Sequence, residues 1–237
     1  MNKRVLAAYA RARALGLRAR AETAAVSTEA LLKALGVYYG VTTLFVAFMT
    51  TEDTSAKLPV YETPQTAAEI IEIGLTPEYA TGQLNASDNV IRDSSLVTRY
   101  TVRLNAARLV PALRRRLIGR LDSGNGLEVV GDNTEGPLCA IGYAANRDDG
   151  TRQMRWLLKG RFKEMSITDK TRERGTIAYV TPVLEGSFVP LDTECTVGGK
   201  TTRPILVEGD TSTGGTSMTF ESFFAAVQLP SVGAAGV

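Results

Sequence analysis

Residues that usually carry acid–base or metal chemistry are scarce in this sequence. The chain of 237 residues has no histidine, and its two cysteines, Cys139 and Cys195, form no C-x-x-C motif. Catalysis by imidazole and metal sites built on histidine are therefore excluded, and a site on two cysteines would need carboxylates as well. Asp148-Asp149 suits a turn and Glu164 suits the end of a strand, so both have structural explanations.

Motifs that bind phosphates or hold nucleophiles are missing as well. The sequence contains no Walker motif, no G-x-G-x-x-G loop after a predicted strand, no G-x-S-x-G elbow and no carboxylate cluster at metal-ligand spacing. We therefore expect a protein that is not an enzyme and that takes no cofactor or metal ion.

The composition is typical of a folded protein, but the charge is uneven. Hydrophobic residues make up 44% of the chain and charged residues 22%, and no apolar run reaches the roughly 20 residues that span a bilayer. The first 21 residues carry six Lys or Arg and no acid, so the net charge of +2 becomes −4 for the remainder. A protein that grips nucleic acid through its body is normally basic there. The mildly acidic body disfavours that class.

A long hairpin followed by a third extended segment organises the chain. Residues 139, 141, 143 and 145 share one face of the first strand, and Asp149-Gly150 supplies a turn. On the return strand, Met154, Trp156, Leu158 and Phe162 alternate with polar or cationic residues. This alternation predicts one buried face and one cationic face. In the later segment at 176–189, Pro182 and Gly186 predict a bulge or a sheet edge.

Three longer strands, one helix and then a short strand around 127–130 are predicted before this hairpin. The longer strands lie at 41–50, 68–79 and 96–105, and in the second of them Ile71, Ile73 and Leu75 should share the buried face. The helix lies at 109–117, with Pro111 in its first turn, Gly119 after its end and a buried stripe of Leu109, Leu113 and Leu117. Arginines at 114–116 and 120 fit the solvated face of this helix better than a DNA contact.

Segments at both ends are predicted to be arms on a central β domain. We place a basic helical arm at 1–36, the β domain at 37–208, and a flexible linker with a helical tail at 209–237. The basic segment could be an organellar targeting peptide, a nucleic-acid tail or an arm that docks on a neighbouring subunit. The arms carry two apolar stripes, which would pack on their own sheet or on another copy of the chain: Leu31, Leu32 and Leu35, and Phe220, Phe223 and Phe224.

Four stretches resemble one family. They are RWLLKGRFKE, GTIAYVTPVLEGSFVPL, GVTTLFVAFMTTEDTS and LVTRYTVRLNAARLVPALRRRLIG, and the resemblance they carry extends over roughly residues 36–191, most of the chain. They are similar to the major tail proteins, the tail-tube subunits, of long-tailed bacteriophages. The resemblance implies a mainly β fold, a β-sandwich flanked by a helix, whose inner strands join those of other subunits into one barrel. It also implies stacked, hexameric rings in the virion tail, assembled in the host cytoplasm, with a tape-measure protein and terminator, connector or baseplate proteins as partners.

Three sets of residues follow as candidate sites under this resemblance. A conduit for DNA should be neutral or acidic, because Lys and Arg in the bore would hold the genome. We therefore expect Glu72, Thr76 and Glu78 to face the lumen, rather than the face with Arg155, Lys159 and Lys163, and double-stranded DNA to pass without specific binding. The two apolar stripes would dock on neighbouring subunits. The polar loop after the first strand would touch the next ring through Thr51, Glu52, Asp53, Thr54, Lys57, Pro59 and Tyr61.

An alternative from another class is a nucleic-acid-associated protein that uses its basic N-terminal segment. Salt distinguishes the two functions, because phosphate binding weakens as salt rises whereas assembly through β-strand edges persists.

Overall fold

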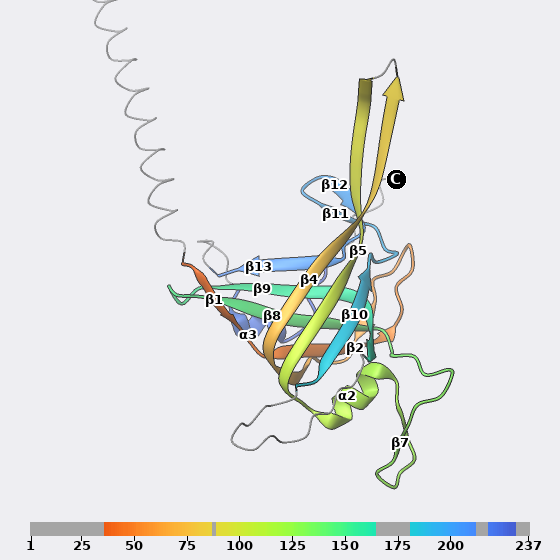
Figure 1. The fold of residues 1–237 in the computed structure, drawn as a ribbon. Helices are drawn as coiled ribbons and strands as arrows, with labels where there is room; N and C mark the ends of the chain where they lie inside the picture. The colour runs from red at the N-terminus through yellow and green to blue at the C-terminus, as the bar shows by residue number, and fades with distance from the viewer. Residues whose placement is uncertain (1–35, 87–88, 165–180, 212–217, 231–237) are drawn as a thin grey trace, which may run out of the picture.

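The structure, a computed structural model, describes residues 36–86, 89–164, 181–211 and 218–230. It is mainly antiparallel β-sheet, which confirms the predicted class (Figure 1). The predicted N-terminal helical arm, except Gly36, lies outside the described residues. The elements are β1 (Tyr38–Val41), β2 (Leu44–Thr51), β3 (Val60–Tyr61), β4 (Gln65–Ala86), β5 (Asn89–Leu109), α2 (Pro111–Ile118), β6 (Leu121–Asp122), β7 (Glu128–Val129), β8 (Cys139–Arg147), β9 (Arg152–Glu164), β10 (Val183–Val189), β11 (Cys195–Val197), β12 (Lys200–Thr202), β13 (Leu206–Asp210) and α3 (Phe220–Phe224).

Six strands pair in a closed circuit around the main core. Hydrogen-bonded neighbours lead from β2 through β8, β9, β10, β5 and β4 back to β2, and every pairing is antiparallel. The inner faces carry one apolar cluster that includes Leu44, Val102, Leu104, Ile141 and Phe188. Strands β1 and β13 extend the sheet beside β8 and β9. The circuit removes most of the unpaired edges that an open sheet would expose.

Helix α2 covers one end of this core. Pro111 stands in its first turn and Gly119 ends it with φ of 74°, the left-handed conformation that favours glycine. A Cβ at Gly119 would lie 2.1 Å from the carbonyl oxygen of Glu135, so a side chain cannot be placed there. Leu117 and Ile118 are buried in the main core. The predicted helix is confirmed from Pro111 onward, whereas Leu109 ends β5.

A bulge in β9 changes which residues face the core. Cys139 pairs with Gly160 and Ile141 with Leu157, so Leu158 and Lys159 together oppose one residue of β8. Leu157 therefore shares the inner core with Phe162, while Trp156 and Leu158 belong to a second cluster outside the circuit. The prediction of one uninterrupted alternation along this strand is wrong, because the bulge reverses the faces partway.

The β4 strand also contains a bulge. Ile70 pairs with Ala106 and Glu72 with Asn105, which leaves Ile71 unpaired and 52% exposed. Ile70 packs on the main core instead. The prediction that Ile71 shares the buried face is therefore wrong, although Ile73 and the residue at 75 do pack there.

Strand β10 lies in the interior of the sheet rather than at an edge. It pairs with β5 on one side and with β9 on the other, without a register shift on either side. A Cβ at Gly186 would lie 3.0 Å from ring atoms of Phe162 and of Phe188. The glycine predicted to mark a bulge or an edge therefore makes room for two core aromatic rings.

The C-terminal segment folds back on the outer side of β8 and β9. Phe223 and Phe224 are 1% and 5% exposed and pack in the second cluster with Trp156. The indole Nε1 of Trp156 donates a hydrogen bond to the carbonyl of Phe223 at 3.0 Å. The predicted linker begins too early, because Gly209 still belongs to β13.

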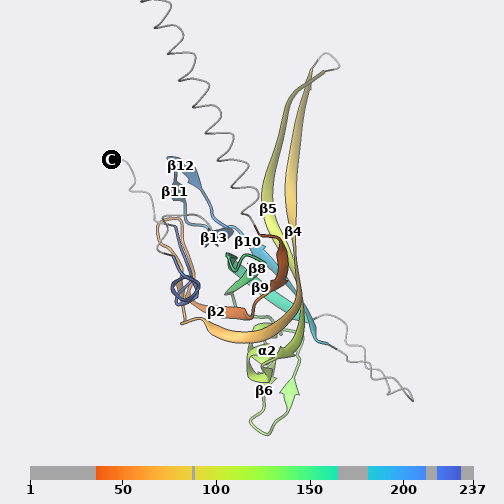
Figure 2. The ribbon, with the colours of Figure 1, turned by 90° about the vertical axis from the view of Figure 1, so that its left-hand side faces the viewer.

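The β4–β5 hairpin extends well beyond the body. Its strands are 22 and 21 residues long, against about 5–6 residues in a typical strand. Figures 1 and 2 both show its upper part as a two-stranded arm, with the β6–β7 hairpin and α2 at the opposite end of the molecule. Within the described ranges, no helix is long and apolar enough to cross a bilayer.

Candidate functional site

A charge cluster built around a buried ion pair holds the loop that joins β2 to β3. Lys159, in the bulge of β9, places its Nζ 2.8 Å from Asp53 Oδ1, 2.9 Å from Asp192 Oδ2 and 3.1 Å from Glu52 Oε1. The side chain of Lys159 is 8% exposed and that of Asp53 is fully buried. The second carboxylate oxygen of Asp53 accepts a hydrogen bond from the backbone N–H of Asp192. We call Lys159, Asp53 and Asp192 the loop clamp.

Neutral hydrogen bonds reinforce the loop clamp. The hydroxyl of Thr193 lies 2.6 Å from the carbonyl of Thr54 and 2.7 Å from that of Lys57, and can donate to either. Tyr61 donates its phenolic hydrogen to the carbonyl of Leu158 at 3.0 Å. The loop is therefore fixed to the body at both of its ends, so its exposed side chains are presented in one arrangement.

Burial and ion pairing shift the pKa values of Asp53 and Lys159 in opposite directions. Burial alone would raise the pKa of Asp53, but the hydrogen bonds from Lys159 and from the backbone of Asp192 hold it below the ordinary value. Burial likewise opposes the charge of Lys159, yet its carboxylate partners raise its pKa above the ordinary value. Both groups are therefore charged at neutral pH.

The residues predicted to touch the next ring divide into two groups. Thr51, Glu52, Thr54 and Lys57 are exposed and can meet a neighbour. Asp53 and Pro59 are buried and Tyr61 is half-buried within their own chain. The second group positions the loop, and the inter-ring contact itself stays a prediction.

The residues predicted to line the lumen lie on the outer face of a four-stranded region, β4–β5–β10–β9. Glu72 and Thr76 are exposed, and Glu78 receives hydrogen bonds from Arg99 Nε at 2.6 Å and from Thr101 Oγ1 at 2.8 Å. These contacts, that of Arg99 first, lower the pKa of Glu78. We call this surface the outer face.

Cationic residues share the outer face with these glutamates. The strand registers place Gly74, Arg103, Glu185 and Lys163 in one cross-strand row, and Thr76, Thr101, Ser187 and Arg161 in the next. The prediction that Lys163 lies on a separate face is therefore wrong. Lys163 is paired with Glu185 at 2.7 Å, and Arg161 is paired with Glu135.

The other two members of the predicted cationic face leave it. Lys159 is buried in the loop clamp, and Arg155 binds Glu208 Oε1 of β13 at 2.6 Å. The bulge in β9 causes the separation, because Arg155 precedes it and Lys163 follows it. No single cationic stripe runs along β9.

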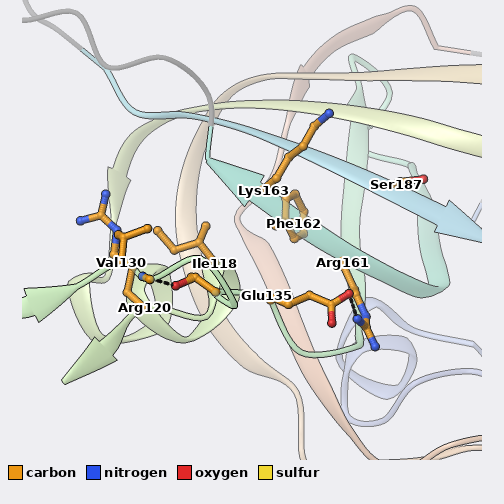
Figure 3. A pocket seen from close by; sticks show the side chains of 11 residues that line it. Ile118, Arg120, Val130, Glu135, Arg161, Phe162, Lys163 and Ser187 are labelled. Atoms are coloured by element: carbon orange, nitrogen blue, oxygen red, sulfur yellow. Dashed lines mark hydrogen bonds and ion pairs between the residues drawn. The ribbon is translucent and has the colours of Figure 1, made fainter.

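A pocket of about 400 Å³ lies between α2, the segment 130–136 and β9 (Figure 3). Ile118 and Phe162 are among its lining side chains, together with the cations Arg120, Arg161 and Lys163. Each of these cations has an acidic partner in the chain, Glu128, Glu135 and Glu185 respectively. The pocket therefore contains cations but no excess positive charge for an anionic ligand.

The arginines around α2 also have partners in their own chain. Arg116 binds both carboxylate oxygens of Glu62, at 2.8 and 2.5 Å. Arg115 pairs with Asp122 at 2.8 Å. These arginines tie α2 to the segment after β3 and to the β6–β7 hairpin, so they do more than form the solvated face that the sequence predicted.

The predicted docking stripes have different outcomes. Leu31, Leu32 and Leu35 lie outside the described residues. Phe223 and Phe224 are buried against their own sheet, and Phe220 packs at the edge of the same cluster. For these aromatic residues to dock on a neighbour, the segment would have to leave this position, and that role stays a prediction.

Sequence reasoning missed two groups of polar contacts. The guanidinium of Arg147 is 5% exposed and binds Asp210 at 2.9 and 2.6 Å and the Tyr38 hydroxyl at 2.7 Å. Asp148 and Asp149 accept hydrogen bonds from the backbone N–H groups of Val37 and Gly36. The paired aspartates were visible as a turn, but nothing local indicated that they fix the start of β1.

Metal binding and thiol reactivity can be judged for the described residues. Among them, no three Cys, Asp or Glu side chains lie close enough together to hold a metal ion. Burial raises the pKa of the Cys139 thiol to about 12 and raises that of Cys195 as well, so neither is a reactive thiolate at neutral pH. No protein-family model matches the chain, and no curated protein matches it.

Proposed function

We propose that the protein is a structural subunit that assembles with copies of itself into stacked rings, and that these rings form the tail tube of a long-tailed bacteriophage. The β4–β5 arm carries this proposal. A lone two-stranded hairpin is marginally stable in water, yet this arm stands beyond the body with Tyr79 and Leu96 at 55% and 71% exposure. Neighbouring subunits that cover the arm would supply the missing contacts.

The outer face supports the further proposal of a conduit. It combines glutamates with arginines and lysines, and the pairs Glu78–Arg99 and Glu185–Lys163 join opposite charges at 2.6 and 2.7 Å. Paired charges attract few counterions, so such a surface would not hold a passing polyanion as free lysines would. On this proposal the outer face lines the bore, with Glu72, Thr76 and Glu78 among the lining residues.

The rest of the proposal comes from the sequence resemblance. A ring of six copies, a β-sandwich-like core whose strands join in a barrel around the bore, a tape-measure protein inside the tube and terminator, connector or baseplate proteins at its ends are what the resemblance implies. The protein would then function in the virion tail.

Negative-stain electron microscopy of the purified protein at low and high salt tests the proposal. Rings or hollow tubes that persist at high salt are expected, because burial of apolar and β-edge surface is not screened by ions. Monomers at every salt and protein concentration would contradict it. DNA binding that disappears as salt rises, without rings, would favour the nucleic-acid alternative instead.

A shortened arm provides the matched variant. Tyr79 pairs with Val97, so residues 80–96 can be replaced by Asn-Gly, which forms a two-residue hairpin turn. We expect this variant to fold like the parent, because the body remains intact, but to lose ring formation. Normal rings from the shortened chain would refute the role of the arm.

A further inference from the structure

The β6–β7 hairpin turns its polar face toward its own chain. Asp122 and Glu128 are cross-strand partners, and they pair with Arg115 and Arg120 of the α2 region at 2.8 and 3.1 Å. The Ser123 N–H also donates to the Leu127 carbonyl at 3.1 Å. These contacts hold the hairpin in one orientation.

The other face of this hairpin is apolar and faces water. Leu121 pairs with Val129 on the side away from the aspartate and glutamate, and the two are 59% and 48% exposed. Leu127, directly before β7, adds an exposure of 65%, whereas Val130 lines the pocket between α2 and β9. A soluble surface hairpin normally shows its charges to water and hides its apolar face. This reversed arrangement marks a contact surface, which we call the apolar knob.

An apolar groove lies near the base of the β4–β5 arm. It encloses about 820 Å³ between β5, β13 and the C-terminal segment. Its lining includes Leu96, Val97, Tyr100, Leu206, Met218 and Leu229. Leu96 and Met218 are 71% and 40% exposed, so the groove has an apolar rim as well as an apolar floor.

We propose that the apolar knob of one copy docks in this groove of a second copy. The β6–β7 hairpin and α2 lie at the end of the molecule opposite the β4–β5 arm (Figures 1 and 2), whereas the residues that line the groove belong to β5, β13 and the C-terminal segment. One chain cannot bring the two together. Two joined copies leave one knob and one groove open, so the contact repeats head to tail and adds copies in one direction.

On the proposed function, this is the contact through which successive rings stack, so the inference rests on that function. Both partners are already ordered within their own chains, the knob by ion pairs and the groove by β13 and the second cluster. Docking therefore removes apolar surface from water with little loss of conformational freedom.

Crosslinking tests the contact directly. The double variant Val97→Cys/Val129→Cys places one thiol in the groove and one on the knob, and a short bis-maleimide joins them when they meet. The native thiols of Cys139 and Cys195 are buried and should not react. We expect a ladder of three or more copies, and only monomers or background from each single-cysteine variant.

Other patterns would overturn the proposal. Rings or tubes in which the 97/129 pair does not crosslink would refute this contact and leave the proposed function standing. That result is also the one expected if residues 1–35 of a copy fill the groove. Dimers from Val129→Cys alone would mean that knobs meet knobs. Monomers under all conditions would refute both the contact and the proposed function.

A charge on the knob gives a second measurement. Val129→Asp should weaken self-association at least about tenfold, measured by sedimentation velocity, because loss of one buried valine alone acts on that scale. The matched control is Val110→Asp, because Val110 is 45% exposed and belongs to neither the knob nor the groove, so this variant should leave association unchanged. Equal association of the two variants would overturn the proposal.

Discussion

Replacing Lys159 with methionine tests the reading of the loop clamp. Methionine keeps most of the length of the side chain but removes the charge that faces Asp53 at 2.8 Å. The carboxylate of Asp53 is fully buried; it would keep its hydrogen bond from the Asp192 N–H but lose its cationic partner. Removing one partner of a buried pair costs about 3–5 kcal/mol. With a slope near 3 kcal/mol per M, the urea midpoint should fall by roughly 1–2 M.

The pH dependence of this variant has a definite sign. In the parent the pKa of Asp53 is below the ordinary value of 3.8, so its contribution is present above that pH and is lost as pH falls through the folded pKa. Burial is already the largest single influence on this pKa, and without Lys159 only backbone hydrogen bonds oppose it, so the pKa of Asp53 should rise. The variant should therefore regain stability relative to the parent as pH falls from 7 toward 4.

A substitution on the same strand is the control. Lys163 pairs with Glu185 at 2.7 Å, but its side chain is 73% exposed, and exposed pairs contribute about 0–1 kcal/mol. Lys163→Met should thus shift the urea midpoint little. Equal shifts of the urea midpoint in Lys159→Met and Lys163→Met would contradict the role of the clamp. So would a double variant, Lys159→Met with Asp53→Asn, that is no more stable than Lys159→Met alone.

Three further predictions concern packing and the loop. Phe223→Ala should lower the free energy of unfolding by about 3–5 kcal/mol, because Phe223 is 1% exposed and packs in the cluster of Trp156. It should also shift the fluorescence emission of Trp156, the only tryptophan, to the red. Unchanged emission would mean that the C-terminal segment does not cover Trp156. Gly186→Ala should lower the free energy of unfolding by about 1–3 kcal/mol, measured by thermal unfolding, because its Cβ would lie 3.0 Å from two core rings. Gly40→Ala is the control and should leave stability nearly unchanged, since a Cβ there meets nothing within 4 Å. Equal losses of stability in the two variants would contradict this packing. The double variant Thr54→Ala/Lys57→Ala changes two exposed side chains of the loop and should reduce tube formation in micrographs without moving the urea midpoint. Normal tubes would refute the assignment of this loop to the inter-ring contact.

Local residue patterns were enough to predict the class of fold and most element positions. Alternation and turn residues placed the β8–β9 hairpin, because one buried face and a glycine turn leave few other conformations for such a segment. Pro111 and Gly119 placed α2, because proline suits a first turn and glycine suits a left-handed end. The uneven charge and the absence of histidine were likewise properties of the chain alone.

The tertiary structure decided which residues act together. The bulge in β9 arises from its pairing with β8, so no local pattern could place Lys159 inside or bring Glu72 and Lys163 onto one face. The clamp joins Asp53 to Lys159 and Asp192, and the knob depends on arginines of the α2 region. A side chain's partner is set by strand register and by packing of distant segments, and a one-residue shift in register reverses the face on which every later side chain lies.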